Sequence, residues 1–202
     1  HETGHALGIE DNNYGENQYP VEKMGDEEWL RTMGHTPSIM TYARHNNMAQ
    51  PEDNIPPSLL IQKVGPTDAY YIRWAYETFP DAMSKEQQGD SLERIIRLQD
   101  TIPWYRLANR HGDTMGPAVT DQVVEVRDPV QGAILGLKNL ERAMELLPSI
   151  NRNRKDYVRI ERIHERAISL WYHLVRRVFS MVGGYEIFYR SMDQQGGNMF
   201  DP

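Results

Sequence analysis

Cysteine is missing altogether from the 202-residue sequence. Its absence excludes disulfide bonds, cysteine-based zinc sites and thiol nucleophiles within this chain. There is also no apolar run of the roughly 20 residues that a membrane-spanning helix requires. No segment of the chain is therefore expected to cross a membrane.

Basic residues are fewer than acidic residues in this chain. The chain has 22 lysine and arginine residues against 29 aspartate and glutamate residues, which gives a formal net charge of −7. A nucleic-acid partner is not expected, because binding to a phosphate backbone relies on clustered basic side chains. Apolar residues make up 39% of the chain, a low fraction that still fits a globular protein with a core of its own.

What the sequence does contain is a series of helix signals. Asp26 can cap a short helix that Gly34 ends, and the pair Asp128-Pro129 is typical of the start of a long helix. We expect a helix end over residues 1–9 and helices over residues 26–33, 67–79, 84–99, 129–148 and 154–182. Only residues 123–126 have a strand pattern, so the sequence predicts a mainly α fold with little or no β-sheet.

The last two helices are expected to form a long antiparallel hairpin, because a short polar link joins them. The stripe of the final helix is broad enough to predict deep burial; it comprises Ile160, Ile163, Ala167, Ile168, Trp171, Leu174, Val175, Val178 and Phe179. The helix over residues 67–79 is expected to face inward through Ile72, Ala75, Tyr76 and Phe79, and its aromatic cluster, which adds Tyr70, Tyr71 and Trp74, is interpreted as core packing. In the helix over residues 84–99, the inward residues are expected to be Leu92, Ile95, Ile96 and Gln99.

The first five residues read H-E-x-x-H. On a helix, His1 and His5 lie one above the other and can bind one metal ion with neighbouring imidazoles. Glu2 is then close enough to take a proton from a metal-activated water. A run this short also arises by chance at an ordinary helix end, so the residues after His5 decide between the two interpretations.

Two later residues extend the motif. Gly8 follows His5 by three positions and Asp11 follows Gly8 by three, so the chain reads H-E-T-G-H-A-L-G-I-E-D. Aspartate is a known zinc ligand, although Asp11 could instead cap a turn in an asparagine-rich loop. His35 or His45 could replace Asp11, but neither has the spacing of the motif; His164 and His173, on the final helix, are interpreted as structural.

This run resembles the metzincin signature H-E-x-x-H-x-x-G-x-x-H, with Asp11 in the place of the third histidine. The segment S-I-M-T-Y at residues 38–42 resembles the methionine turn of astacins and serralysins. In their order along the chain, the segments are similar to the bacterial Met-zincin zinc-dependent metalloproteases; they are residues 1–12, 38–44, 49–51, 65–76 and 128–147. That family usually has His-Asn where this chain has Asp11-Asn12.

The resemblance implies a zinc-dependent endopeptidase whose Zn²⁺ ligands are His1, His5 and Asp11. By the same correspondence Glu2 activates water and later passes the proton to the leaving amine. Tyr42 supports the oxyanion, and Met40 forms an apolar base under the ligands.

The resemblance also implies an organisation. Residues 1–64 would carry the active-site helix end, the loop and the methionine turn, and residues 65–202 a helical C-terminal subdomain that forms one compact unit with them. The partners would be a protein or peptide substrate and an N-terminal catalytic subdomain upstream of His1, in an exported protein. On this interpretation the 202-residue chain alone is expected to be inactive.

Two other functions use the same residues. One is a non-catalytic helical interaction module with a degenerate metal site, which Asp11 in place of histidine supports. The other is a zinc hydrolase that acts on a non-peptide substrate. Loss of activity on substitution of Glu2 would exclude the interaction module.

Overall fold

The computed structural model describes residues 1–12, 14–106, 126–153, 155–179, 182, 186–187 and 200–201. The fold is mainly α, as predicted. The α-helices are α1 (Glu2–Ala6), α2 (Glu27–Thr32), α3 (Pro66–Tyr76), α4 (Lys85–Ile96), α5 (Pro129–Ile150) and α6 (Val158–Phe179). Short 3-10 helices are η1 (Tyr14–Gln18), η2 (Val21–Gly25), η3 (Pro51–Asp53), η4 (Pro57–Leu59), η5 (Arg97–Asp100) and η6 (Pro103–Tyr105). Strands β1 (Glu186–Ile187) and β2 (Phe200–Asp201) form one antiparallel pair.

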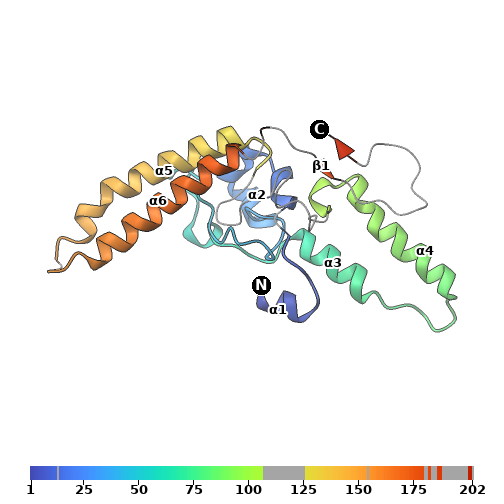
Figure 1. The fold of residues 1–202 in the computed structure, drawn as a ribbon. Coiled ribbons are helices and arrows are strands. Elements are labelled where there is room, and N and C mark those ends of the chain that lie inside the picture. Colours follow the sequence, from blue (N-terminus) through green and yellow to red (C-terminus); the bar gives the residue numbers. More distant parts are fainter. Residues whose placement is uncertain are drawn as a thin grey trace.

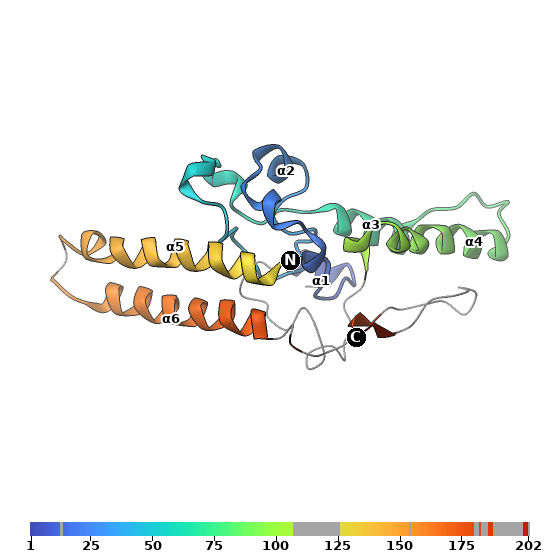
Figure 2. The ribbon, with the colours of Figure 1, turned by 90° about the horizontal axis from the view of Figure 1, so that it is seen from above.

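The elements are laid out along one direction (Figures 1 and 2). Helices α5 and α6 lie side by side as a hairpin at one end, and α4 extends toward the other. Between them lie α1, α2 and the loops of the N-terminal third. The predicted hairpin is confirmed, since α5 and α6 pack against each other along their length.

The helices begin where the sequence places their caps. The Asp26 carboxylate accepts a hydrogen bond from the Trp29 backbone N–H at 3.0 Å. The Ser84 hydroxyl accepts one from the Gln87 N–H at 3.2 Å. Asp128 accepts two bonds of the same kind at the start of α5. Each cap satisfies backbone donors that have no partner within the helix.

The helix ends differ from prediction. Helix α3 stops at Tyr76, not at residue 79, because Pro80 disfavours helical geometry in the residue before it. Helix α5 runs through Pro148 to Ile150, where only the final turn is affected by the missing N–H. Helix α6 covers Val158–Phe179 and is shorter at both ends than the predicted range. Residues 123–125, most of the predicted strand, lie outside the described residues.

The core is built mainly from turns and loops. Its buried residues are Tyr19, Met24, Ala43, Met48 and Val126. The Tyr19 ring meets Trp29 and Trp104 edge-on, at centroid distances of 5.1 Å and 5.5 Å, and edge-to-face contact is a favoured aromatic geometry. Trp104 therefore packs inward, as the sequence indicates.

The prediction that the α6 stripe is deeply buried is wrong. Ala167 and Leu174 are buried, but Trp171 is 51% exposed and Phe179 70% exposed. Helix α6 packs mainly on α5. Because a single neighbouring helix covers only a narrow strip of its surface, the rest of the apolar stripe of α6 stays exposed. The two helices approach closely at Gly136, where a Cβ would lie 2.8 Å from Leu174 Cδ2.

The predicted inward face of α3 is also wrong. Its buried residues are Thr67, Asp68 and Tyr70, whereas Trp74 is 44% exposed and Tyr76 53% exposed. The reason is that α3 buries a polar contact through Asp68, and this sets the rotation of the helix. Helix α4 agrees with prediction, since Ile95 and Gln99 are buried and Leu92 and Ile96 half-buried.

In the part of the chain that the structure describes, no helix is both long enough and apolar enough to cross a membrane.

Candidate metal centre

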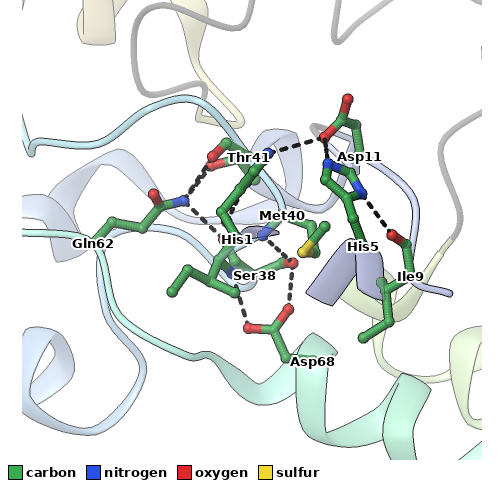
Figure 3. A network of polar contacts seen from close by, with 10 residues as sticks. His1, His5, Ile9, Asp11, Ser38, Met40, Thr41, Gln62 and Asp68 are labelled. Atoms are coloured by element: carbon green, nitrogen blue, oxygen red, sulfur yellow. Dashed lines mark hydrogen bonds and ion pairs between the residues drawn. The ribbon is translucent and has the colours of Figure 1, made fainter. Parts of the chain in front are cut away.

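Three side chains from the first eleven residues converge on one point (Figure 3). His1 Nε2 and His5 Nε2 each lie 3.3 Å from Asp11 Oδ1. All three atoms lie within 4.8 Å of one another. Among the described residues, these three form the group of histidine and acidic side chains able to hold a metal ion.

Both imidazoles are oriented by backbone carbonyls. His1 Nδ1 lies 2.8 Å from the Ile39 carbonyl oxygen, and His5 Nδ1 lies 2.9 Å from the Ile9 carbonyl oxygen. A carbonyl only accepts, so each Nδ1 carries a hydrogen, and in a neutral ring Nε2 is then the nitrogen that can bind a metal ion. The same second contact fixes the ring orientation of histidine ligands in metal sites.

The donor set fits zinc. With each Nδ1 occupied by a backbone carbonyl, the two Nε2 atoms and Asp11 Oδ1 are the atoms that can face a shared cation. His1 Nε2 is buried and makes no hydrogen bond in the structure. Two imidazoles and a carboxylate are ligands that Zn²⁺ accepts, and three protein ligands leave a fourth position open.

Gly8 turns the chain from α1 back to the ligand cluster. Its φ is +83°, a left-handed geometry that glycine adopts without strain. The Gly8 N–H donates to the His5 carbonyl at 2.9 Å, and the Ile9 N–H to the Gly4 carbonyl at 3.0 Å. These two hydrogen bonds complete the last turn of α1 before the chain continues to Asp11.

Met40 packs against Gly4 of α1. Its side chain is fully buried. A Cβ at Gly4 would collide with the Met40 thioether, so the second variable position of H-E-x-x-H must be very small here. The Asn12 N–H also donates to the Met40 carbonyl at 3.0 Å. This bond connects the loop that carries Asp11 to the methionine turn.

Asp68 anchors the methionine turn from α3. One carboxylate oxygen accepts from the Ser38 hydroxyl at 2.5 Å. The other accepts from the backbone N–H groups of Ile39 at 2.8 Å and Gly65 at 2.7 Å. Since the Ile39 carbonyl also accepts from His1 Nδ1, Asp68 is linked to His1 through the single residue Ile39.

Sequence reasoning missed this role of Asp68, and also that of Gln62. The Gln62 amide donates to the Ser38 and Thr41 carbonyls at 3.2 Å and 3.0 Å. By itself the run G-P-T-D predicts only a helix start, and Asp68 does accept the Gly65 N–H there. An acidic residue at such a start, with a Ser-x-Met turn upstream, is the signal that could have suggested the contact.

The two catalytic candidates are both neighbours of His1, Glu2 in the sequence and Tyr42 through a ring contact. Glu2 is exposed in the first turn of α1. The half-buried Tyr42 ring lies 4.7 Å from the His1 ring, centroid to centroid, with the planes tilted by 56°. Both positions border the ligand cluster.

The structure does not bring His35 or His45 into the cluster. His35 is buried, and its Nε2 lies 2.8 Å from the Ala43 carbonyl oxygen. Burial lowers the pKa of His35 to about 4, and the contact with Ala43 only partly offsets this. His45 is exposed and pairs with Ile61 through the backbone. Asp11 is therefore the third candidate ligand that the fold supplies.

A family model described as Met-zincin matches residues 1–202. The chain belongs to the Met-zincin family. Comparisons with curated proteins and with solved structures found no match. Membership gives this Met-zincin the general character of a zinc-metalloprotease-like protein, and the convergence of His1, His5 and Asp11 agrees with it.

Proposed function

We propose that the natural protein carrying this chain is a zinc-dependent endopeptidase, with His1, His5 and Asp11 as the zinc ligands. The observation that carries the proposal is the meeting of His1 Nε2, His5 Nε2 and Asp11 Oδ1, with both Nδ1 atoms occupied by carbonyls. Zinc at such a site lowers the pKa of a water to near neutrality and so supplies the nucleophile.

The chain's own residues supply the remaining roles. Glu2 takes the proton from the attacking water and passes it to the leaving amine, which is general base and then general acid catalysis. Tyr42 donates a hydrogen bond to the carbonyl oxygen as negative charge develops on it. Met40 and Asp68 keep His1 in place from below.

The substrate we propose is a protein or peptide, and the protein an exported one. These two statements rest on Met-zincin membership. The acidic balance of the chain is consistent with a substrate other than nucleic acid.

The test compares Glu2→Gln with wild type in the natural protein. Zinc content is measured together with the rate of cleavage of an unfolded protein substrate and of a non-peptide amide. We expect Glu2→Gln to keep its zinc and lose at least about 100-fold in rate, because general base catalysis contributes that much or more. Glu145→Gln, an exposed carboxylate on α5, is the matched control and should cleave normally.

Two results would contradict the proposal. Cleavage that survives Glu2→Gln would remove Glu2 from the mechanism. Zinc-dependent turnover of the amide alone, with no cleavage of the protein substrate, would replace the endopeptidase by a hydrolase of another class.

A further inference from the structure

A cavity of about 240 Å³ opens beside the metal centre. One wall is the loop over residues 7–12, and the other is α3, with the end of α4 closing one side. Most of its lining is apolar or aromatic: Leu7, Ile9, Tyr70, Tyr71, Trp74, Ala75 and Ile96. Asp11, a candidate zinc ligand, also lines it.

The two walls are tied together at both ends. The Tyr76 hydroxyl donates to the Leu7 carbonyl at 2.9 Å. The Asn12 amide donates to the Tyr71 hydroxyl oxygen at 2.6 Å. Because Tyr71 and Tyr76 lie on the same helix, the loop is held against α3 at two points. The cavity is thus part of the fold.

Trp74 lines this cavity, and its side chain is only partly covered. Its side chain is 44% exposed, although an indole gains much free energy from burial. An apolar occupant would cover the exposed ring. The position of Trp74 between the two ties keeps the ring beside the space that such an occupant would fill.

The size of the cavity sets the class of occupant. An apolar protein cavity of about 150 Å³ is large enough to bind benzene. The cavity beside Asp11 is larger than this, so it accepts an aromatic ring or a branched aliphatic side chain. Glu10 also lies on its lining, and the negative charge of this side chain disfavours an acidic occupant.

We propose that this cavity binds a large apolar side chain of the polypeptide substrate, aromatic or branched aliphatic, next to the bond that is cleaved. The inference rests on the proposed endopeptidase function and names its specificity. Asp11 carries the argument, because it belongs to both the ligand cluster and the cavity wall. An occupant of the cavity therefore lies beside Asp11, and so next to the candidate metal centre. Trp74 and Ala75 are then specificity-determining residues.

The experiment measures kcat/KM of the zinc-loaded natural protein on matched peptides. The peptides differ only at one position beside the cleaved bond, which holds Phe, Leu, Ala or Asp. We expect kcat/KM for Phe or Leu to exceed that for Ala by about ten-fold or more, as burial of a large apolar side chain predicts. Asp should be the poorest of the four.

Variants on α3 test whether the cavity causes the preference for a large apolar side chain. Ala75→Phe fills the cavity and should bring the Phe-to-Ala ratio close to one while the Ala peptide is still cleaved. Ala69→Phe makes the same change on an exposed part of α3 outside the cavity and should leave the ratio unchanged. Trp74→Ala removes one wall and should also lower the ratio, which provides a second variant if Ala75→Phe does not fold.

Zinc content and unfolding temperature are measured for each variant. If the Phe-to-Ala ratio is unchanged in both cavity variants while zinc content and folding are intact, the cavity does not bind the substrate side chain. The endopeptidase proposal is not affected by this result. A segment of the chain or a partner that fills the cavity would give the same outcome. An equal loss for all peptides also overturns the proposed role of the cavity. Absence of Glu2-dependent cleavage in wild type overturns both proposals.

Discussion

Asp11 gives this site a chemical character of its own at the scale of single residues. A carboxylate replaces the neutral imidazole of the signature that the sequence resembles, so the ligand set carries a negative charge. That charge attracts a divalent cation and offers it a harder donor atom. The fold places Asp11 Oδ1 3.3 Å from each of the two histidine nitrogens, close enough for one cation to contact all three atoms.

Substitution of Asp11 tests this arrangement. Asp11→Ala removes one of three ligands, and we expect the zinc Kd to rise by at least about 100-fold, since even loss of a supporting contact costs ten- to 100-fold. Asp11→His restores a donor and should bind within about ten-fold of wild type. Competition with a chromophoric chelator measures both, and an unaltered Kd in Asp11→Ala would show that another group holds the metal.

His35 makes stability depend on pH. Burial lowers its pKa to about 4, whereas in the unfolded chain it is near 6.5. The unfolded state therefore binds more protons between these values, and the free energy of unfolding should fall by about 3 kcal/mol as the pH drops from 6.5 to 4. The stabilisation is complete above pH 6.5.

Denaturant unfolding across this pH range measures the effect. His35→Gln should remove this part of the slope, whereas His164→Gln, at an exposed position on α6, should keep it. Identical slopes in wild type and His35→Gln would mean that folding does not lower the pKa of His35.

At the scale of elements, the contact between α3 and the methionine turn has the largest consequences. Asp68→Ala leaves the Ile39 and Gly65 N–H groups and the Ser38 hydroxyl without their acceptor. We expect a loss of about 3 kcal/mol or more in the free energy of unfolding, because these bonds involve a buried charge. Zinc should also bind about ten-fold more weakly.

Asp90→Ala is the control for this change, since Asp90 is an exposed carboxylate on α4. It should alter stability by less than about 1 kcal/mol and leave the zinc Kd unchanged. If Asp68→Ala kept full zinc affinity, the path from Asp68 through Ile39 to His1 would have no role in metal binding.

The sequence predicted these elements unevenly. Caps and spacing located the helices because Asp26, Ser84 and Asp128 act on the backbone next to them. The buried faces of α3 and α6 were not predictable in the same way, since they depend on neighbours distant in sequence. At the candidate site, the spacing of His1 and His5 and the resemblance to the metzincin signature predicted the three residues that converge, while Asp68 is linked to His1 through a contact across 29 residues.

At the scale of the whole molecule, the α5–α6 hairpin is fastened to the N-terminal part by polar contacts. The Asn139 amide donates to the carbonyls of Asn47 at 3.0 Å and Ala49 at 2.8 Å. Arg142 donates to the Gln50 side-chain oxygen at 2.8 Å. The hairpin thus depends on a few directional bonds in the segment over residues 47–50.

Asn139→Leu removes both amide bonds from this contact. We expect a loss of about 1–3 kcal/mol in the free energy of unfolding, because two half-buried carbonyls lose their donor. Hydrogen exchange should speed up first in α5. Lys138→Leu, at the exposed neighbouring position, is the control, and equal effects of the two changes would show that the polar contacts do not hold the hairpin.

The chain of hydrogen bonds from Asp68 through Ile39 to His1 also couples metal binding to folding. It closes loops of 29 and 38 residues, and closing such loops costs conformational entropy that only the folded chain repays. The unfolded chain therefore offers a metal ion the nearby side chains of His5 and Asp11 but no oriented His1. We therefore expect the folded chain to bind a metal ion more tightly than the unfolded chain, so that metal binding stabilises the fold.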